Sequence, residues 1–164
     1  MNCRFEEVQK DHLQTLLEIY NYYVLNSTST FHQKELNTEE MTNLLFFNQP
    51  QYKAFTIFFN EDIAGYVVLA RHKQREAYAL TAEIAVYLKA KFKGKGIGKE
   101  AVRFIEKFAI SKKFHTLIAN VCSENIESIK LFAALGYTKC AHFSEVGKKF
   151  DRFLDVVSFQ KILE

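Results

Sequence analysis

Residues able to bind a phosphate and to accept a proton lie close together in the middle of this sequence. The phosphate candidate is a basic turn with three spaced glycines, formed by Lys93, Gly94, Lys95, Gly96, Ile97 and Gly98. Glycine permits positive φ and a close backbone approach, so such a turn directs several N–H groups at one point. The proton acceptor is Glu83, a carboxylate shortly before the turn that could act as a general base.

The turn departs from two common phosphate-binding patterns. A P-loop requires Ser or Thr after its lysine, whereas Glu100 follows Lys99. The dinucleotide pattern G-x-G-x-x-G fails because the glycine that follows Gly96 is Gly98. Taken alone, the turn is either a pyrophosphate-binding element or an ordinary glycine-rich connection with solvated lysines.

A strand before the turn and a helix after it must position these residues. Ile84, Val86 and Leu88 alternate with smaller or polar-tipped residues, which predicts a largely buried strand ending at Leu88. After the turn, apolar residues recur at helical spacing over 97–111. A helix N-terminus next to the turn would add its own free N–H groups for an anion.

The rest of the chain predicts an α+β protein with a mixed sheet. Asp11 is the expected N-cap of the first helix, 60–62 a hairpin turn, and Gly136 a left-handed helix stop. The pattern predicts helices at 11–26, 38–47 and 125–135, and strands at 2–8, 55–59, 63–69, 114–121, 137–143 and 150–159.

Composition limits the functional class. With 164 residues and 48% apolar content, the chain is expected to form one domain, 1–164. A net charge of +3 does not indicate nucleic acid as a partner, and no membrane span or signal peptide is expected. Cys3, Cys122 and Cys140 form an odd set without C-x-x-C spacing, which predicts reduced thiols in a cytoplasmic protein and no metal site.

The turn resembles the Q/R-x-x-G-x-G/A element of the GCN5-related N-acetyltransferase (GNAT) superfamily, with Lys93 in place of Gln or Arg. In that superfamily the element holds the pyrophosphate of acetyl-CoA. The predicted order of strands and helices is similar to the GNAT fold over the whole chain. The resemblance therefore implies a GNAT fold and acetyl-CoA as co-substrate.

Several separate segments resemble one group in particular, the phosphinothricin and methionine sulfoximine N-acetyltransferases. Departures from that group's pattern are Lys73, Ala79, Asn120, Phe132 and Phe153. The matching segments are Ile19-Tyr20-Asn21 with Asn26 and Phe31, the run from Arg75 through Ala77, Tyr78 and Thr81 to Glu83, the turn itself, 114–119, and 145–155.

The resemblance implies roles for the residues around the turn. Glu83 would take the proton of the acceptor amine, directly or through a water, and the N–H of Leu88 would hold the developing oxyanion. The main chain of Val86, Tyr87 and Leu88 would pair with the pantetheine. Asn125 would hydrogen bond to the pantetheine or to groups next to it. Residues 93–98 would hold the pyrophosphate.

The resemblance also implies an amino-acid-like amine as acceptor. Lys73 and Arg75 would bind its carboxylate, while Tyr78 and Phe31 would form apolar walls. Lys149 would face the pocket or a subunit partner. A homodimer is expected by analogy.

Alternatives remain at each of these points. Glu83 could be a solvated or ion-paired strand residue, and Asn125 a helix cap. Phe132 occupies the position of the usual proton donor and cannot donate, and the phenols of Tyr87 and Tyr137 suit core packing better. The acceptor could be another small amine or a protein N-terminus, and a non-catalytic acyl-CoA-binding module is the alternative outside enzymes.

Overall fold

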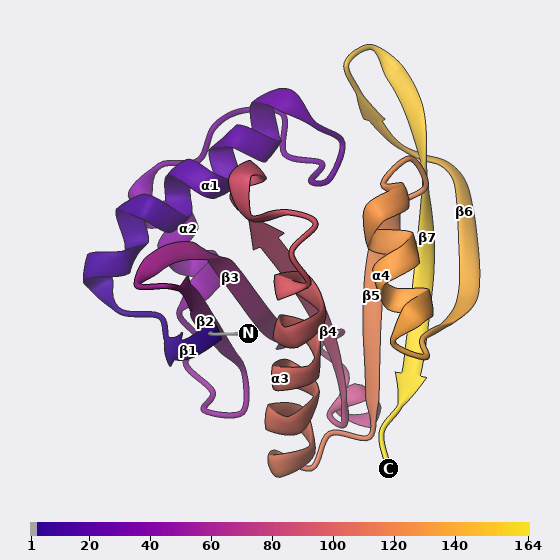
Figure 1. Cartoon of the computed structure of the whole chain (residues 1–164). Coiled ribbons are helices and arrows are strands. Elements are labelled where there is room, and N and C mark those ends of the chain that lie inside the picture. Colours follow the sequence, from indigo (N-terminus) through magenta and orange to yellow (C-terminus); the bar gives the residue numbers. More distant parts are fainter. Residues whose placement is uncertain (1–2) are drawn as a thin grey trace.

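A seven-stranded sheet forms the frame of the molecule, in the order β1-β2-β3-β4-β5-β7-β6 (Figure 1). The computed structural model describes residues 3–164. Neighbouring strands are antiparallel except β4 and β5, which run parallel, so the predicted α+β class with a mixed sheet is confirmed. The strands are β1 (Cys3–Glu7), β2 (Lys53–Phe59), β3 (Asp62–Arg71), β4 (Thr81–Leu88), β5 (Thr116–Cys122), β6 (Thr138–Lys149) and β7 (Arg152–Ile162), and the helices are α1 (Leu13–Asn26), α2 (Thr38–Leu45), α3 (Ile97–Ser111) and α4 (Ile126–Ala134).

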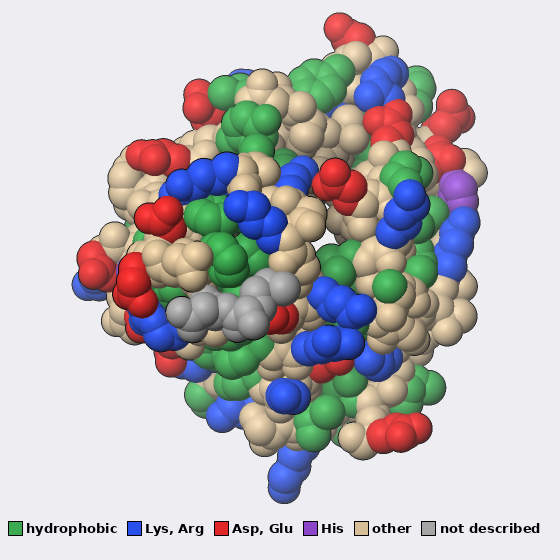
Figure 2. Space-filling model, in the orientation of Figure 1, with side chains coloured by type: hydrophobic (Ala, Val, Ile, Leu, Met, Phe, Trp, Pro, Cys, Tyr) green, Lys and Arg blue, Asp and Glu red, His purple; other side chains and the backbone are tan. Residues whose placement is uncertain are grey.

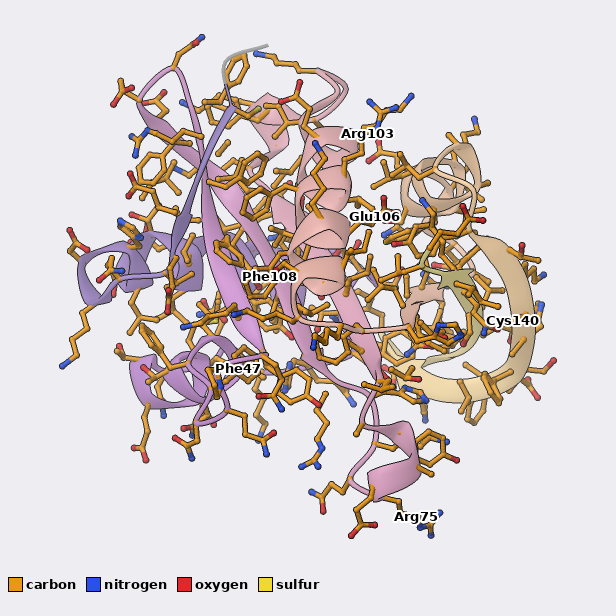
Figure 3. The ribbon with its side chains drawn as sticks, turned by 90° about the horizontal axis from the view of Figure 1, so that it is seen from below. Phe47, Arg75, Arg103, Glu106, Phe108 and Cys140 are labelled. Carbon is orange, nitrogen blue, oxygen red and sulfur yellow. The ribbon has the colours of Figure 1, made fainter. Side chains whose placement is uncertain are left out.

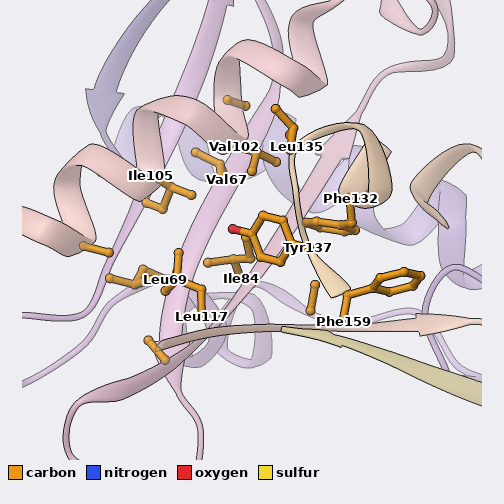
Figure 4. Close-up of a cluster of buried hydrophobic side chains, with 14 of the residues drawn as sticks. Val67, Leu69, Ile84, Val102, Ile105, Leu117, Phe132, Leu135, Tyr137 and Phe159 are labelled. Carbon is orange, nitrogen blue, oxygen red and sulfur yellow. The ribbon is translucent and has the colours of Figure 1, made fainter. Parts of the chain in front are cut away.

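Helices cover both faces of the sheet and form one core on each face. The side chains of β4 alternate in direction, so they contribute to both cores. Ile84 packs with Val102 and Ile105 of α3 (Figure 4). Tyr87 packs on the other face, against the core that α1 and α2 form with the sheet. Successive strand residues point to opposite faces, so Glu83 lies on the α1 and α2 face with Tyr87.

The sheet opens in its middle, between β4 and β5. Their ladder consists of Thr81–Glu83 opposite Thr116–Ile118. The pairing of β3 with β4 nevertheless continues to Leu88, and that of β5 with β7 continues to Cys122. Beyond Glu83 the two central strands therefore diverge, and each keeps its outer neighbour.

The structure confirms several predicted boundaries. The helix after the turn spans Ile97–Ser111 as expected, and Gly136 has φ of 82°. The second helix begins at Thr38 behind Asn37, whose Oδ1 accepts the N–H of Glu40 at 2.9 Å.

Two local predictions were wrong. Asp11 is not the N-cap of the first helix, because a 3-10 turn, Lys10–His12, precedes α1 and the N–H of Gln9 donates to His12 Nδ1. Phe150 does not begin the last strand. It forms the β6–β7 turn with Asp151, both at positive φ, because β6 continues past an irregularity between Phe143 and Gly147.

Candidate active site

A cavity of about 430 Å³ occupies the opening between β4 and β5. Figure 2 shows the hollow on this face of the molecule, with Lys and Arg side chains at its rim. The cavity is lined by Ile84–Leu88 of β4, by Asn120–Cys122 of β5, and by Tyr23, Ser29, Lys93, Gly94, Gly96, Gly98, Lys99, Asn125, Glu127, Ser128, Lys130, Leu131 and Phe132. The structure thus places most of the predicted cofactor residues around one space.

The β4 wall presents to this cavity backbone N–H groups that do not bond to β3. Lys89 N–H donates to Ala64 O of β3 at 2.8 Å. Because hydrogen-bonded and non-bonded pairs alternate along an antiparallel ladder, the main chain of Val86 and Leu88 faces away from β3. Their N–H groups therefore face the side where β5 has diverged, and can bond to an extended ligand as an added strand would.

The glycine turn ends at the same cavity. Gly94 and Gly96 have φ of 72° and 79°, and Gly96 is the N-cap of α3. A residue with a Cβ is disfavoured in this left-handed region. Two residues of the turn point elsewhere: the side chain of Ile97 is fully buried in the core, and Lys95 Nζ lies 5.5 Å from the ring centre of Phe92.

Tyr23 of α1 supports this end of the cavity, a role that sequence reasoning did not assign to it. Its hydroxyl donates to the carbonyl of Leu88. Lys93 Nζ lies 5.2 Å from its ring centre and 3.3 Å from a carboxylate oxygen of Glu127. Burial lowers the pKa of Lys93, but the contacts with Tyr23 and Glu127 outweigh it and raise that pKa, so the ammonium stays charged.

Replacing Tyr23 with phenylalanine should weaken binding of the acetyl-CoA that the sequence resemblance implies for this cavity, without changing kcat much. The lost hydrogen bond is worth about 1 kcal/mol, which corresponds to roughly a fivefold rise in Kd. Isothermal titration calorimetry measures that rise. Tyr22→Phe is the matched control, because Tyr22 is exposed and lies outside the cavity lining. An unchanged Kd in Tyr23→Phe would show that Leu88 needs no such support.

Asn125 is the N-cap of α4. Its Oδ1 accepts the N–H of Ser128 at 3.2 Å, and its Nδ2 donates to Ser29 Oγ at 3.2 Å. The amide therefore joins α4 to the segment that follows α1, and it lines the cavity at the same time.

Glu83 lies where the β4–β5 ladder ends, next to the cavity residues Ile84 and Ala85. Its side chain is 35% exposed and accepts a hydrogen bond from Nδ1 of His72 at 2.8 Å. Sequence reasoning gave His72 no role. The sequence could not show that His72 lies near Glu83, because this depends on the register of β3 with β4. In that register Ala70 lies opposite Glu83, and His72 lies two positions beyond Ala70.

A family model described as an acetyltransferase (GNAT) domain matches residues 7–157. The chain belongs to the GNAT acetyltransferase family. It is therefore an acyltransferase of the EC 2.3.1 class.

Named relatives of this GNAT enzyme match it over all or nearly all of its length. It is 28% identical to the L-methionine sulfoximine/L-methionine sulfone acetyltransferase of Salmonella typhimurium, covering 100% of this chain and 95% of that protein. It is 27% identical to the phosphinothricin N-acetyltransferase of Streptomyces coelicolor, covering 95% and 93%. The Sinorhizobium meliloti phosphinothricin acetyltransferase, solved in complex with acetyl-CoA, superposes with a TM-score of 0.93 at 25% identity, covering 99% and 89%.

The predicted acceptor residues of this acetyltransferase lie in two groups. Lys73 and Tyr78 are on the β3–β4 connection, with Lys73 Nζ 5.2 Å from the Tyr78 ring centre. Arg75, on the same connection, lies at the edge of the molecule (Figure 3). These three residues do not line the cavity at β4.

Phe31 and Lys149 form the second group. The Phe31 ring packs on Gly147, where an added Cβ would lie 2.3 Å from Phe31 Cε2. Lys149 is 1% exposed, and its Nζ donates to Thr30 O at 2.8 Å. Burial lowers the pKa of Lys149. Its ammonium therefore joins the β6–β7 hairpin to the segment after α1, and the expected role at the pocket or with a partner stays a prediction.

None of the three residues considered as the donor of a proton to the leaving thiolate is suited to that role. Phe132 lines the cavity and has no proton to give. The hydroxyl of Tyr137 is buried in the core without a partner in the described part of the chain, and burial raises its pKa. Tyr87 lines the cavity, but its hydroxyl points to Ser29 O at 3.5 Å and burial raises its pKa as well.

Among residues 3–164, no group of three or more His, Cys, Asp and Glu could hold a metal ion. Within the same residues, none of the helices has the length and apolarity needed to cross a membrane.

Proposed function

We propose that this GNAT enzyme moves the acetyl group of acetyl-CoA to the amine of a small amino-acid-like acceptor, of the phosphinothricin or methionine sulfoximine type, by direct transfer. The acceptor class is supported by the names of the relatives, which match the chain over nearly its full length at 27 to 28% identity. The use of acetyl-CoA is supported by the related structure that contains it.

One observation carries the proposal: the cavity between β4 and β5 ends beside Glu83. The cavity wall includes side chains of α4 and the turn before α3. Glu83 is not among the residues that line the cavity, and its carboxylate contacts His72 of the β3–β4 connection. A co-substrate in the cavity and an acceptor held at that connection would therefore meet at the end of the ladder, as direct transfer between two bound molecules requires.

Acetyl-CoA fits the polar groups that line this cavity. The main chain of Val86 and Leu88 would bond the pantetheine, and the N–H groups of residues 94–98 would hold the pyrophosphate beside Lys99. Both β4 N–H groups are candidates for stabilising charge on the carbonyl oxygen. With about 3.3 Å per residue, Val86 lies roughly 10 Å from Glu83 and Leu88 roughly 16 Å, so Val86 is the nearer donor.

Glu83 would remove a proton from the acceptor amine. An α-amine with a pKa near ~8 is mostly protonated at neutral pH and cannot attack a thioester until it loses that proton. The acceptor carboxylate would be held by Lys73 and Arg75, with Tyr78 as an apolar wall. These side chains belong to the same short connection as His72, which contacts Glu83.

The proposal is tested by measuring acetyl-CoA-dependent release of CoA thiol with a panel of acceptors. The panel contains phosphinothricin, methionine sulfoximine, methionine sulfone, simple amino acids, a polyamine and a peptide with a free N-terminus. Saturable turnover confined to the first three supports the proposal. Turnover confined to the polyamine or the peptide would contradict the acceptor class while leaving the acetyltransferase assignment intact.

A homodimer in the cytoplasm is the second part of the proposal. The β6–β7 hairpin exposes Phe143, Val146, Phe150 and Phe153, apolar side chains that a subunit interface could cover. Cys3, Cys122 and Cys140 are all free thiols, as expected in a reducing compartment. Sedimentation velocity tests the dimer, and a monomer across the micromolar range would rule it out.

A further inference from the structure

His72 is the hydrogen-bond partner that the described residues provide for the Glu83 carboxylate. The pair joins His72 Nδ1 to Glu83 Oε1 at 2.8 Å. The imidazole is 15% exposed, so this contact is better shielded from water than a surface ion pair.

The strand register explains why these two side chains meet. Ala70 pairs directly with Glu83 across the β3–β4 ladder, and Arg71 pairs with Ala82. Side chains alternate along a strand, so the side chain of His72 lies on the same face as that of Ala70. His72 is therefore the diagonal neighbour of Glu83. Diagonal neighbours on one face are within reach of a long or aromatic side chain.

The connection that follows β3 holds the imidazole in place. The ring of His72 packs edge-on against Tyr78, with 5.6 Å between ring centres. Tyr78 belongs to a 3-10 turn, Glu76–Tyr78, and its N–H donates to Arg75 O at 3.0 Å. The imidazole is therefore restrained on one side by an aromatic ring and bonded on the other to a carboxylate.

The chemistry of the pair defines which atom carries the proton. An ionised carboxylate only accepts hydrogen bonds, so His72 Nδ1 must be the donor. The bond occupies Oε1 of Glu83 and restricts rotation of the carboxylate. Oε2 has no protein partner among residues 3–164.

We propose that His72 is a positioning residue for this acetyltransferase: it holds Oε1 of Glu83 so that Oε2 is directed at the acceptor amine. The inference rests on the proposed role of Glu83 as the base. It adds a residue that neither the sequence pattern nor the comparisons assign. A base that is held in one orientation needs no reorganisation before proton transfer, and a misplaced one loses much of its rate advantage.

The test compares two isosteric replacements, His72→Leu and His72→Asn. Asparagine carries its amide nitrogen on Cγ, as histidine carries Nδ1, so it can still donate to Oε1, whereas leucine has the same shape and no donor. Steady-state kinetics with the best acceptor should show kcat reduced about 10- to 100-fold in His72→Leu. His72→Asn should restore most of that loss. The KM for acetyl-CoA should stay unchanged in both, since His72 does not line the cavity.

A double variant separates this proposal from the role of Glu83. In a Glu83→Gln background, His72→Leu should cause no further loss of kcat, because the carboxylate that it orients is absent. If Glu83→Gln lowers kcat and His72→Leu does not, the positioning role alone is overturned. If Glu83→Gln keeps wild-type kcat, Glu83 is not the base, and both the proposed mechanism and the positioning role of His72 are overturned.

Two further variants guard against a purely structural effect. If His72→Leu does not fold, His72→Gln serves instead, because its amide nitrogen lies one bond farther from Cα and cannot take the same position. Wild-type kcat in a folded His72→Gln would overturn the proposal. The matched control is His142→Leu, which removes another imidazole–carboxylate pair, His142 Nε2 to Asp155 Oδ2 at 2.7 Å on the β6–β7 hairpin, and should leave kcat unchanged.

Discussion

Replacing Glu83 with glutamine should lower kcat about 10²- to 10⁴-fold, the range typical of a lost general base. Glutamine keeps the size of the side chain and can still hydrogen bond to His72, but it cannot take a proton from the acceptor. The Kd for acetyl-CoA should stay near the wild-type value, because Glu83 is not among the residues that line the cavity that the co-substrate would occupy.

Two measurements check this expectation together. Steady-state CoA release with a saturating acceptor gives kcat, and calorimetric titration gives the Kd for acetyl-CoA. Glu76→Gln is the control, since Glu76 is an exposed carboxylate on the neighbouring β3–β4 connection. A wild-type kcat in Glu83→Gln at every pH tested would remove Glu83 from the mechanism.

Replacing Gly65 with alanine should disrupt the wall of the cavity and destabilise the protein. Gly65 lies opposite Leu88 in the β3–β4 ladder. An added Cβ would lie 2.0 Å from the carbonyl oxygen of Tyr87 and 2.9 Å from Leu88 Cα. Both contacts are with backbone, so no side-chain rotation relieves them and the strands must separate. We expect a loss of about 3 kcal/mol in the free energy of unfolding, which lowers Tm by roughly 6 to 12 °C for a chain of this length.

The same substitution should weaken acetyl-CoA binding, because it displaces the main chain that faces the cavity. Thermal unfolding followed by circular dichroism measures the stability, and calorimetry measures the Kd. Gly98→Ala is the matched control for stability: its Cβ would lie 3.5 Å from Leu131 Cδ2 and 3.8 Å from Leu88 Cδ1, which is ordinary contact. A Gly65→Ala protein with wild-type Tm would show that β3 and β4 are farther apart than the structure has them.

The local elements of the fold were predictable because each depends on neighbours in the chain. The helix at 97–111 follows from its apolar spacing, and the stop at Gly136 from the ease with which glycine adopts positive φ. The error in the last strand arose where a contact distant in the chain decided the backbone. At the β6–β7 hairpin, the N–H of Glu145 donates to Asp155 Oδ1 at 2.8 Å, and β6 continues to Lys149.

The sequence by itself determined the family, the order of the elements and the turn at 93–98, since a motif and its periodic flanks are encoded locally. Only the tertiary structure decided which side chains meet at the site. The divergence of β4 from β5 leaves Val86 and Leu88 facing a cavity, and the register of β3 brings His72 to Glu83. Pairing between strands and contacts such as Tyr23 to Leu88 join residues far apart in the chain, and no local pattern specifies such a partner.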